Sequence, residues 1–250
     1  MPNSEQLPGV AATAAHASGL SSDAAASPLD NPLWFALSGS QRRFSFGDDH
    51  VRRYELDVAP FAAFAGPISD CAQSLRQVIP SQVKTAFVTR EPLTLPAEFE
   101  IENRAILEQW IAPKPEGLLV TTQPELLGPA DVSQMMDLVT IAKPGPFLPR
   151  THELGNYYGF RSEGRLVAMA GERMQIPGFT EVSAVATHPE FRGKGYSKSL
   201  LATLFRSIID RGQAPFLQVL ADNSAAISLY RHFGMSKRCE LRMVVASKRP

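Results

Sequence analysis

Apolar side chains recur with helical spacing in three stretches of the second half of the chain. The stretch from Asp131 to Ile141 predicts an amphipathic helix capped near its first residue. From about Lys194 to Arg211, leucine, phenylalanine and isoleucine side chains share one face and charged side chains the other. Gly212 then stands where a helix would end. The pattern from Ser224 to Phe233 predicts a third helix.

Between these helices the apolar residues recur with the shorter period that is typical of strands. Five stretches are predicted as strands, namely Asn156–Arg161, Leu166–Glu172, Glu181–Thr187, Phe216–Leu220 and Leu241–Ala246. The third and fourth are joined by a helix, and a crossover of this kind places its two strands parallel and adjacent in one sheet. The order helix, three strands, helix, strand, helix, strand therefore predicts an α/β (α+β) fold with a mixed central sheet and helices on both faces.

The first half of the chain shows weaker patterns, which predict a smaller α/β segment over residues 31–115. Asn31 followed by Pro32 indicates the N-terminus of a short helix. Strands are predicted over residues 42–46, 51–56 and 83–89, and the apolar spacing from Phe99 to Trp110 predicts a helix. Pro113 and Pro115 mark the end of this segment, so residues 117–250 are expected to form the second domain.

Composition narrows the class of protein. Residues 1–30 are rich in alanine, serine and proline and contain no lysine or arginine, which predicts a disordered tail rather than a targeting signal. The formal net charge is zero, so nothing favours nucleic acid or an anionic membrane as a partner. Cys71 and Cys239 are too few for a disulfide framework, and no apolar run reaches the ~18 residues of a membrane span. A cytoplasmic protein is expected.

A glycine-rich bend before the second predicted helix carries the first chemical signal. Unpaired N–H groups at a helix N-terminus attract anions such as a pyrophosphate, and Gly193 and Gly195 let the backbone approach one closely. A Walker A loop is excluded because its first glycine is missing, and a dinucleotide fingerprint is excluded because Lys198 replaces its third glycine. The remaining pattern is Arg-x-x-Gly-x-(Gly or Ala), met by Arg192, Gly195 and, with a small substitution, Ser197.

This loop resembles the acyl-CoA loop of the GNAT (GCN5-related) N-acetyltransferase superfamily, and its surroundings agree over about residues 117–250. Asn223 follows the next predicted strand, as in the family. The family's aliphatic–Tyr and Gly–Phe signature is closely matched by Ala226, Leu229, Tyr230, Phe233, Gly234 and Met235. The stretch from Glu181 to Pro189, with Lys143–Phe147 upstream, is similar to sequences of a bacterial subgroup of predicted acetyltransferases with an N-terminal extension. The resemblance implies the acyl-CoA N-acyltransferase type of sheet, acetyl-CoA as co-substrate and no metal.

The resemblance also implies roles for particular residues. The pantetheine arm would lie between two diverging parallel strands and pair with Val185, Ala186 and Thr187, and the N–H near Val185 would stabilise the oxyanion. Asn223 would contact the pantetheine amides and cap its helix. Tyr230 would protonate the departing thiolate as a general acid. The pyrophosphate would be held by the loop residues Arg192, Gly193, Lys194, Gly195, Tyr196 and Ser197.

The general base is left between alternatives. Glu181, at the start of the central strand, is the leading candidate, and its carboxylate is equally expected to lie in solvent at the strand edge or to pair with Arg173 instead. His188 has a suitable unperturbed pKa but sits in a His-Pro turn. His152 and Glu153, in the loop after the proline-rich segment, are weaker candidates for lining the acceptor pocket.

The sequence therefore predicts an acyl-CoA-dependent N-acyltransferase that acetylates a primary amine of a small molecule or peptide by direct attack in a ternary complex. A covalent route through Cys239 lacks a histidine partner in sequence reach. The alternative function is a non-catalytic acyl-CoA sensor, against which Tyr230 and Asn223 argue. The segment 31–115 would wall the acceptor site, or would be a degenerate second copy of the same fold. A homodimer is possible.

Overall fold

The computed structural model describes residues 27–112 and 118–250. The α-helices are α1 (Pro32–Ser38), α2 (Ile68–Val78), α3 (Val132–Ala142), α4 (Tyr196–Asp210) and α5 (Ser224–His232). The strands are β1 (Ser45–Gly47), β2 (Val51–Tyr54), β3 (Phe61–Phe64), β4 (Thr85–Thr89), β5 (Phe99–Ile111), β6 (Glu125–Leu127), β7 (Tyr157–Ser162), β8 (Arg165–Ile176), β9 (Phe179–Thr187), β10 (Ala214–Leu220) and β11 (Ser236–Lys248). None of the helices in these residues is long and apolar enough to cross a bilayer.

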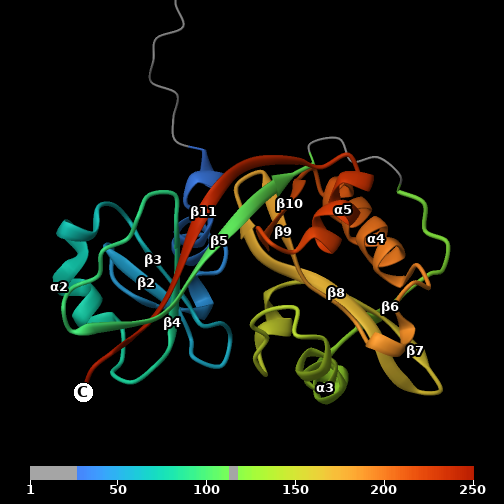
Figure 1. Ribbon diagram of the computed structural model, residues 1–250, viewed down its shortest axis with the longest axis horizontal. Coiled ribbons are helices and arrows are strands. Elements are labelled where there is room, and N and C mark those ends of the chain that lie inside the picture. Colours follow the sequence, from blue (N-terminus) through green and yellow to red (C-terminus); the bar gives the residue numbers. More distant parts are fainter. Residues whose placement is uncertain (1–26, 113–117) are drawn as a thin grey trace, which may run out of the picture.

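All strands belong to one eleven-stranded sheet with the order β1-β2-β3-β4-β11-β5-β10-β9-β8-β7-β6. Figure 1 shows two halves side by side, an N-terminal half in blue and teal and a C-terminal half in yellow and orange. The long strands β5 (green) and β11 (red) run across the boundary between them. The mixed sheet with helices on both faces, predicted from the sequence, is confirmed.

The C-terminal half combines three antiparallel strands with one parallel pair. β7 pairs antiparallel with β6 and β8, and β8 pairs antiparallel with β9, whereas β10 lies parallel to β9 after the crossover through α4. α4 and α5 cover one face through a cluster that includes Leu204, Phe205 and Tyr230. α3 covers the other face through Met135 and Leu138. The apolar stripes that predicted these helices are thus the surfaces that they bury against the sheet.

The N-terminal half repeats this arrangement in a shorter form. β1, β2 and β3 are antiparallel, and β4 lies parallel to β3 after a crossover through α2. α1 packs in a cluster with Tyr54 and Phe61, and α2 packs with Phe87 in another cluster on the opposite face. The order helix, three antiparallel strands, helix, parallel strand therefore occurs twice, which supports the alternative of a second copy of the fold. β3 and α2 were not among the elements predicted from the sequence.

Each half is completed by a strand that belongs to the other half in sequence. β5 and β11 pair with each other antiparallel along their lengths. β5 also pairs with β10, although it precedes the C-terminal half in the chain. β11 also pairs with β4, although it ends the chain. The two halves therefore exchange their last strands, and the sheet is continuous through the exchange.

The prediction of a helix from Phe99 to Trp110 was wrong, because this stretch forms β5. Apolar residues also occupy alternate positions in this stretch, at Phe99, Ile101, Ala105 and Leu107. This period of two is typical of a strand, and it prevails over the helical spacing. Hydrogen bonding to β11 on one edge and to β10 on the other fixes the extended conformation. Pairing with strands distant in sequence overrides a local helical spacing.

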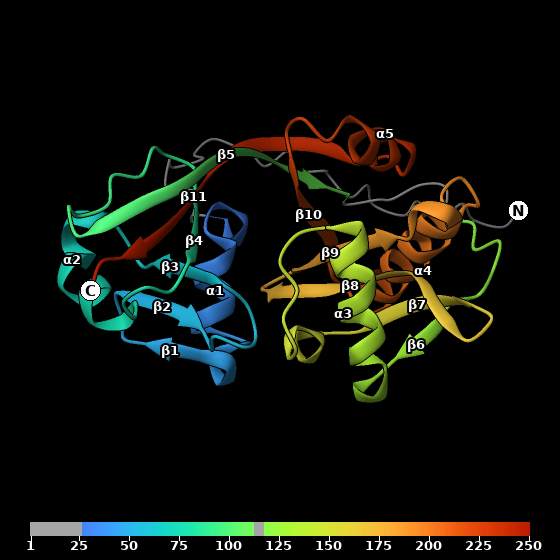
Figure 2. The ribbon, with the colours of Figure 1, turned by 60° about the horizontal axis from the view of Figure 1, so that its bottom comes forward.

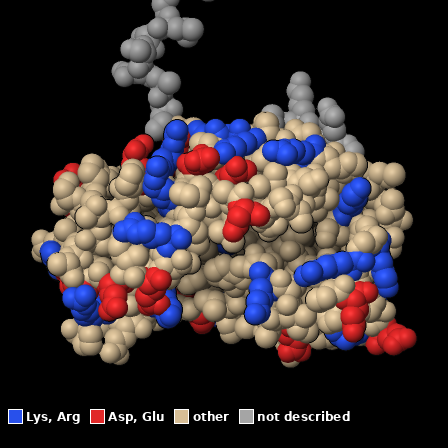
Figure 3. Space-filling model, in the orientation of Figure 1, with Lys and Arg blue, Asp and Glu red and all other residues tan. Residues whose placement is uncertain are grey.

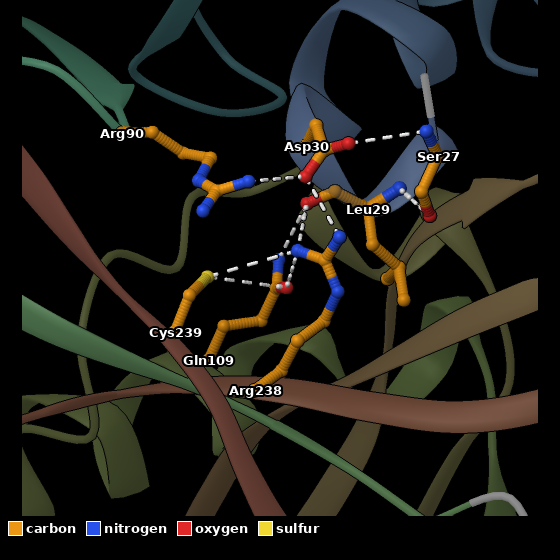
Figure 4. Close-up of polar contacts among 7 residues, drawn as sticks. All are labelled: Ser27, Leu29, Asp30, Arg90, Gln109, Arg238 and Cys239. Atoms are coloured by element: carbon orange, nitrogen blue, oxygen red, sulfur yellow. Dashed lines mark hydrogen bonds and ion pairs between the residues drawn. The ribbon is translucent and has the colours of Figure 1, made fainter. Parts of the chain in front are cut away.

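A polar cluster joins the start of the described chain to β11 (Figure 4). The carboxylate of Asp30 accepts hydrogen bonds from Arg90 at 2.8 Å and from Arg238 at 2.7 Å. Gln109 on β5 donates to the Leu29 carbonyl at 2.9 Å, and the Leu29 side chain is buried. Residues 28–30 therefore form an ordered 3-10 turn, whereas the predicted tail extended to residue 30. The remainder of that tail lies outside the described residues.

Candidate active site

The two parallel strands of the C-terminal half pair with each other only near their N-terminal ends. The register joins Phe179–Glu181 of β9 to Ala214–Phe216 of β10, with no later pair between them in the described chain. β9 continues to Thr187 against β8, and β10 continues to Leu220 against β5. Two strand edges with free N–H and C=O groups therefore face each other across a gap, into which an extended ligand can add as a strand.

A bulge in β9 opens this gap. The register with β8 shifts between the Gly171–Ser183 and Met169–Ala186 pairs, and Ala184 has a φ of 53°. A left-handed alanine costs roughly 1–2 kcal/mol, so the surrounding sheet must impose it. Because a bulge bends its strand, it turns the end of β9 away from β10. The predicted pantetheine-binding residues 185–187 lie on this bent edge.

The loop between β9 and α4 presents a row of backbone N–H groups. Within the described residues, the N–H groups from Gly193 to Lys198 have no hydrogen-bond acceptor, and the first bond of the helix runs from Ser199 to the Gly195 carbonyl. Gly193 and Gly195 have φ values of 78° and 82°, which only glycine adopts without strain. The loop stands at the N-terminus of a 15-residue helix, whose dipole adds positive potential. This geometry suits a pyrophosphate.

Side chains around the loop fix it in place. The hydroxyls of Thr187 and Ser197 are 3.0 Å apart, so they tie the end of β9 to the first turn of α4. Tyr196 stacks on Phe160 of β7 with 4.7 Å between ring centroids. Arg192 and Lys194 are exposed beside the loop, where their charges can reach a bound phosphate. All the residues predicted to hold the pyrophosphate thus lie in this loop and the first turn of α4, at the open end of the gap.

We expect Gly195→Val to weaken acetyl-CoA binding by about tenfold or more, because a β-branched residue cannot adopt this φ without distorting the N–H row. Isothermal titration with acetyl-CoA measures the effect. Gly212→Val is the matched control, since Gly212 has a φ of 74° at the far end of α4 and also has open space around it. Equal affinity in the two variants would contradict the role of the loop.

Asn223 and Tyr230 come from α5, which follows β10. The Asn223 side chain accepts a hydrogen bond from the Ala226 N–H at 3.2 Å, so it caps the helix as predicted. Tyr230 is 7% exposed and packs with Leu217 and Val219 on β10. Burial raises the pKa of its hydroxyl to about 12, and the negative charge of Glu181 adds to the shift. The phenol is therefore protonated at every physiological pH.

Glu181 is fully buried and pairs with Arg173. Its two carboxylate oxygens accept from Nε and Nη2 of Arg173, both at 2.7 Å. The Arg173 guanidinium also lies over the Phe61 ring of the N-terminal half at 4.8 Å. The contact between Glu181 and Arg173, one of the two expected alternatives, is present. The role of Glu181 as general base stays a prediction.

We expect Glu181→Gln to lower the free energy of unfolding by about 3–5 kcal/mol, because it leaves the Arg173 charge buried without a counter-charge. The side chain of Arg173 is only 11% exposed, so water cannot replace the carboxylate. Urea unfolding gives the measurement. The double variant Glu181→Leu/Arg173→Met removes both charges and should recover most of the loss. Full stability of Glu181→Gln would rule out this account.

The weaker candidates lie elsewhere. His188 follows β9 and its Nδ1 is 3.4 Å from the Glu190 N–H, so it caps the short turn Pro189–Phe191. Glu153 pairs with Arg150, and His152 is partly buried in the same turn. Cys239 lies in β11, where its sulfur is 3.7 Å from the Gln109 side chain in the cluster of Figure 4.

Sequence reasoning missed two residues on strands of the C-terminal half. Tyr157 on β7 and Gln218 on β10 each bury a polar atom that has no hydrogen-bond partner among the described residues. Neither stands in a recognisable motif. Only the three-dimensional pairing of four strands brings them to the same face of the sheet.

The equivalent place in the N-terminal half is closed by the chain itself. Like β9 and β10, the parallel strands β3 and β4 pair over a short stretch, here of two positions, and their ends flank a cavity of about 120 Å³. The Asn31 side chain donates a hydrogen bond to the Phe64 carbonyl at the end of β3, at 2.8 Å. Asp30 and Asn31 line the same cavity. A ligand that added to this strand would have to displace Asn31.

Diverging parallel strands, a bulge and a helix-terminal anion cradle define the acyl-CoA N-acyltransferase class of fold and site. The model of a family described as FR47-like protein matches residues 157–244. The crystal structure of a GNAT-family acetyltransferase from Novosphingobium aromaticivorans is 33% identical, with a TM-score of 0.82, over 90% of this chain and 100% of that one. The chain therefore belongs to the GNAT N-acetyltransferase superfamily, and the resemblance found in the sequence is confirmed.

Two further relatives are more distant or shorter in overlap. N-alpha-acetyltransferase RimI of Mycobacterium tuberculosis is 38% identical over 87 residues, which are 33% of this chain and 52% of RimI. The match thus spans about half the length of that relative. A GCN5-related N-acetyltransferase from Kribbella flavida shares 18% identity and a TM-score of 0.56 over 85% of this chain and 93% of that chain. This last likeness is one of fold.

Proposed function

We propose that the protein transfers an acetyl group from acetyl-CoA to a primary amine of a small molecule or peptide. The observation that carries the proposal is the open edge of β9, which ends in the N–H row before α4, with Tyr230 buried in the same hydrophobic cluster as Val182 of β9. The family supports acetyl transfer in general. The kind of acceptor and the mechanism are our proposals.

The proposed reaction is direct attack in a ternary complex. The amine nitrogen attacks the thioester carbonyl carbon, and the Val185 N–H on the open edge stabilises the resulting oxyanion. The carbon–sulfur bond then breaks, and the thiolate takes the proton of Tyr230. Ala186 and Thr187 hold the pantetheine as an added strand, Asn223 meets its amides, and the loop Arg192–Ser197 holds the pyrophosphate. Catalysis is then mainly positioning plus protonation.

The proton that leaves the amine needs a second group. We assign it to Glu181, through a water molecule, since both carboxylate oxygens already accept from Arg173. Because Arg173 fixes the orientation of the carboxylate, the pair would act as one unit. The pairing also makes Glu181 a structural residue, so its two roles must be separated by experiment.

We expect each chain to bind one acetyl-CoA. The C-terminal half offers a free strand edge and a glycine loop, whereas Asn31 occupies the equivalent edge of the N-terminal half. Titration calorimetry gives the stoichiometry directly. Two equivalent sites per chain would contradict the assignment.

The test is release of free CoA thiol from acetyl-CoA in the presence of a panel of primary amines. The thiols of Cys71 and Cys239 give a background that is measured without amine. Amine-dependent release supports the enzyme. Binding of acetyl-CoA without release for any amine would favour the alternative, a non-catalytic sensor. Absence of binding would overturn both readings.

A further inference from the structure

Two buried side-chain atoms stand out because they have no hydrogen-bond partner in the described residues: the hydroxyl oxygen of Tyr157 and the amide nitrogen Nε2 of Gln218. An unpaired buried polar group costs about 1–3 kcal/mol, so such atoms are rare and each needs an explanation. Neither atom has a role in the mechanism proposed above. Each would be satisfied by a polar atom of a ligand.

The sheet register places both residues level with the point where the gap opens. Tyr157 on β7 pairs with Gly171 on β8, which pairs with Ser183 on β9. The last paired residues of the two parallel strands are Phe216 on β10 and Glu181 on β9. Gln218 lies two residues beyond Phe216, and Ser183 lies two residues beyond Glu181, so the two face each other across the gap. Residues two apart on a strand share a face. The four residues therefore form one row across one face of the sheet, interrupted by the gap.

The ring of Tyr157 extends over β8 along this row. A Cβ placed on Gly171 would lie 2.2 Å from Cδ1 of Tyr157, so only glycine allows the ring to cross here. Phe147 packs edge-on against the Tyr157 ring, with 5.5 Å between the ring centroids, and holds it in place. The hydroxyl is close enough to Arg173 and Glu181 for their charges to act on it. Tyr157 thus reaches from β7 toward the strand that would carry the thioester.

The face that carries this row is turned toward the N-terminal half. Gln218 pairs with Gln109 of β5, whose side chain reaches the Leu29 carbonyl of the N-terminal half. Phe216, on the same face, packs in one cluster with Tyr54. α1 lies against β8 from the same side (Figure 2). Figure 3 shows the surface recessed where the two halves meet.

The chemistry of this face selects a neutral hydrogen-bond acceptor. Arg173 and Glu181 neutralise each other, so the face offers neither a free cation nor a free anion from this pair. Burial raises the pKa of the Tyr157 hydroxyl, so the phenol keeps its proton and can donate it. Gln218 Nε2 is a donor as well. Two neutral donors suit carbonyl oxygens, whereas a carboxylate would need a cation and a polyamine has no oxygen to offer.

We propose that Tyr157 and Gln218 form the acceptor subsite and bind peptide carbonyl oxygens next to the reacting amine, so that the acceptor is the α-amine of a peptide. This inference rests on the acetyl transfer proposed above. Tyr157 and Gln218 are then specificity-determining residues for the acceptor.

The test compares three acceptors: an alanyl-alanine amide, free alanine and spermidine. With the wild type, kcat/KM for the peptide amide should exceed that for the other two by more than tenfold. Tyr157→Phe and Gln218→Leu should each raise KM for the peptide amide about fivefold to tenfold, the range that one lost neutral hydrogen bond gives. Affinity for acetyl-CoA should not change. Tyr158→Phe, the same change on the opposite face of β7, is the control.

Thermal unfolding separates this role from a structural one. Because the Tyr157 hydroxyl has no partner in the protein, its removal should leave Tm unchanged or raise it. A lower Tm with an unchanged KM in both variants would overturn the inference. Equal use of spermidine and the peptide amide would overturn it too, while acetyl transfer itself would stand. If no amine released thiol, the proposed function would fall and the acceptor subsite with it.

Discussion

A fragment of residues 118–250, expressed alone, should fail to fold, although it contains the glycine loop, Asn223 and Tyr230. In the whole chain β5 lies between β10 and β11, and it comes from residues 99–111. Without β5 the fragment leaves one edge of β10 and the length of β11 unpaired. Unpaired, apolar strand edges favour aggregation.

Co-expression with residues 1–112 is the matching experiment. That fragment carries β5 and lacks β11, so each fragment supplies the strand that the other needs. We expect the pair to co-purify and to show the circular dichroism of the intact protein, while each fragment alone is insoluble or unfolded. A soluble, cooperatively unfolding 118–250 fragment would contradict the exchange of strands.

Tyr230→Phe should lower kcat on the order of 10²-fold or more, because in the proposed mechanism the Tyr230 hydroxyl supplies the proton that the leaving thiolate takes. The ring stays in the core, so stability and acetyl-CoA affinity should stay near those of the wild type. Steady-state thiol release gives kcat, and titration calorimetry gives the affinity. Tyr158→Phe again serves as the matched control, since it makes the same change at a partly buried tyrosine on β7 that packs against the same cluster as Tyr230.

The pH dependence gives a second check on Tyr230. Its pKa is raised to about 12, so the acid form is complete below that pH and is lost only above it. The wild-type rate should therefore not fall between pH 7 and about pH 10 through loss of this proton. A variant with unchanged kcat, or a basic limb in this range that vanishes in Tyr230→Phe, would count against a buried phenol as the acid.

Local signals were enough to predict the elements that position the candidate site. The Gly193–Gly195 bend, the long apolar face of α4 and the apolar run of β10 are each specified within about twenty residues, because a crossover unit is a local motif. Asn223 was predicted as a helix cap for the same reason, and the structure has that hydrogen bond. The family followed from the spacing of these residues.

What the sequence could not supply depends on contacts between distant segments. β5 was predicted as a helix because its partners lie more than a hundred residues away on β10 and β11. The burial of Leu29 depends on the N-terminal turn meeting β5 and β11, which composition does not reveal. The choice between solvent and Arg173 for Glu181 is likewise decided by packing. Tyr157 becomes a candidate only because its buried hydroxyl has no hydrogen-bond partner among the described residues, which the sequence does not reveal.

Asn31, which closes the strand edge of the N-terminal half, has an evolutionary consequence. If the chain arose by duplication, the N-terminal half, whose strand edge Asn31 closes, is free to vary under a different selection. Its Tyr54 and Phe61 pack against the face of the catalytic half that holds Arg173 and Phe216. Changes there can reshape the proposed acceptor subsite without touching the loop proposed to hold the cofactor. Related enzymes should therefore diverge in acceptor preference mainly through substitutions in their N-terminal halves.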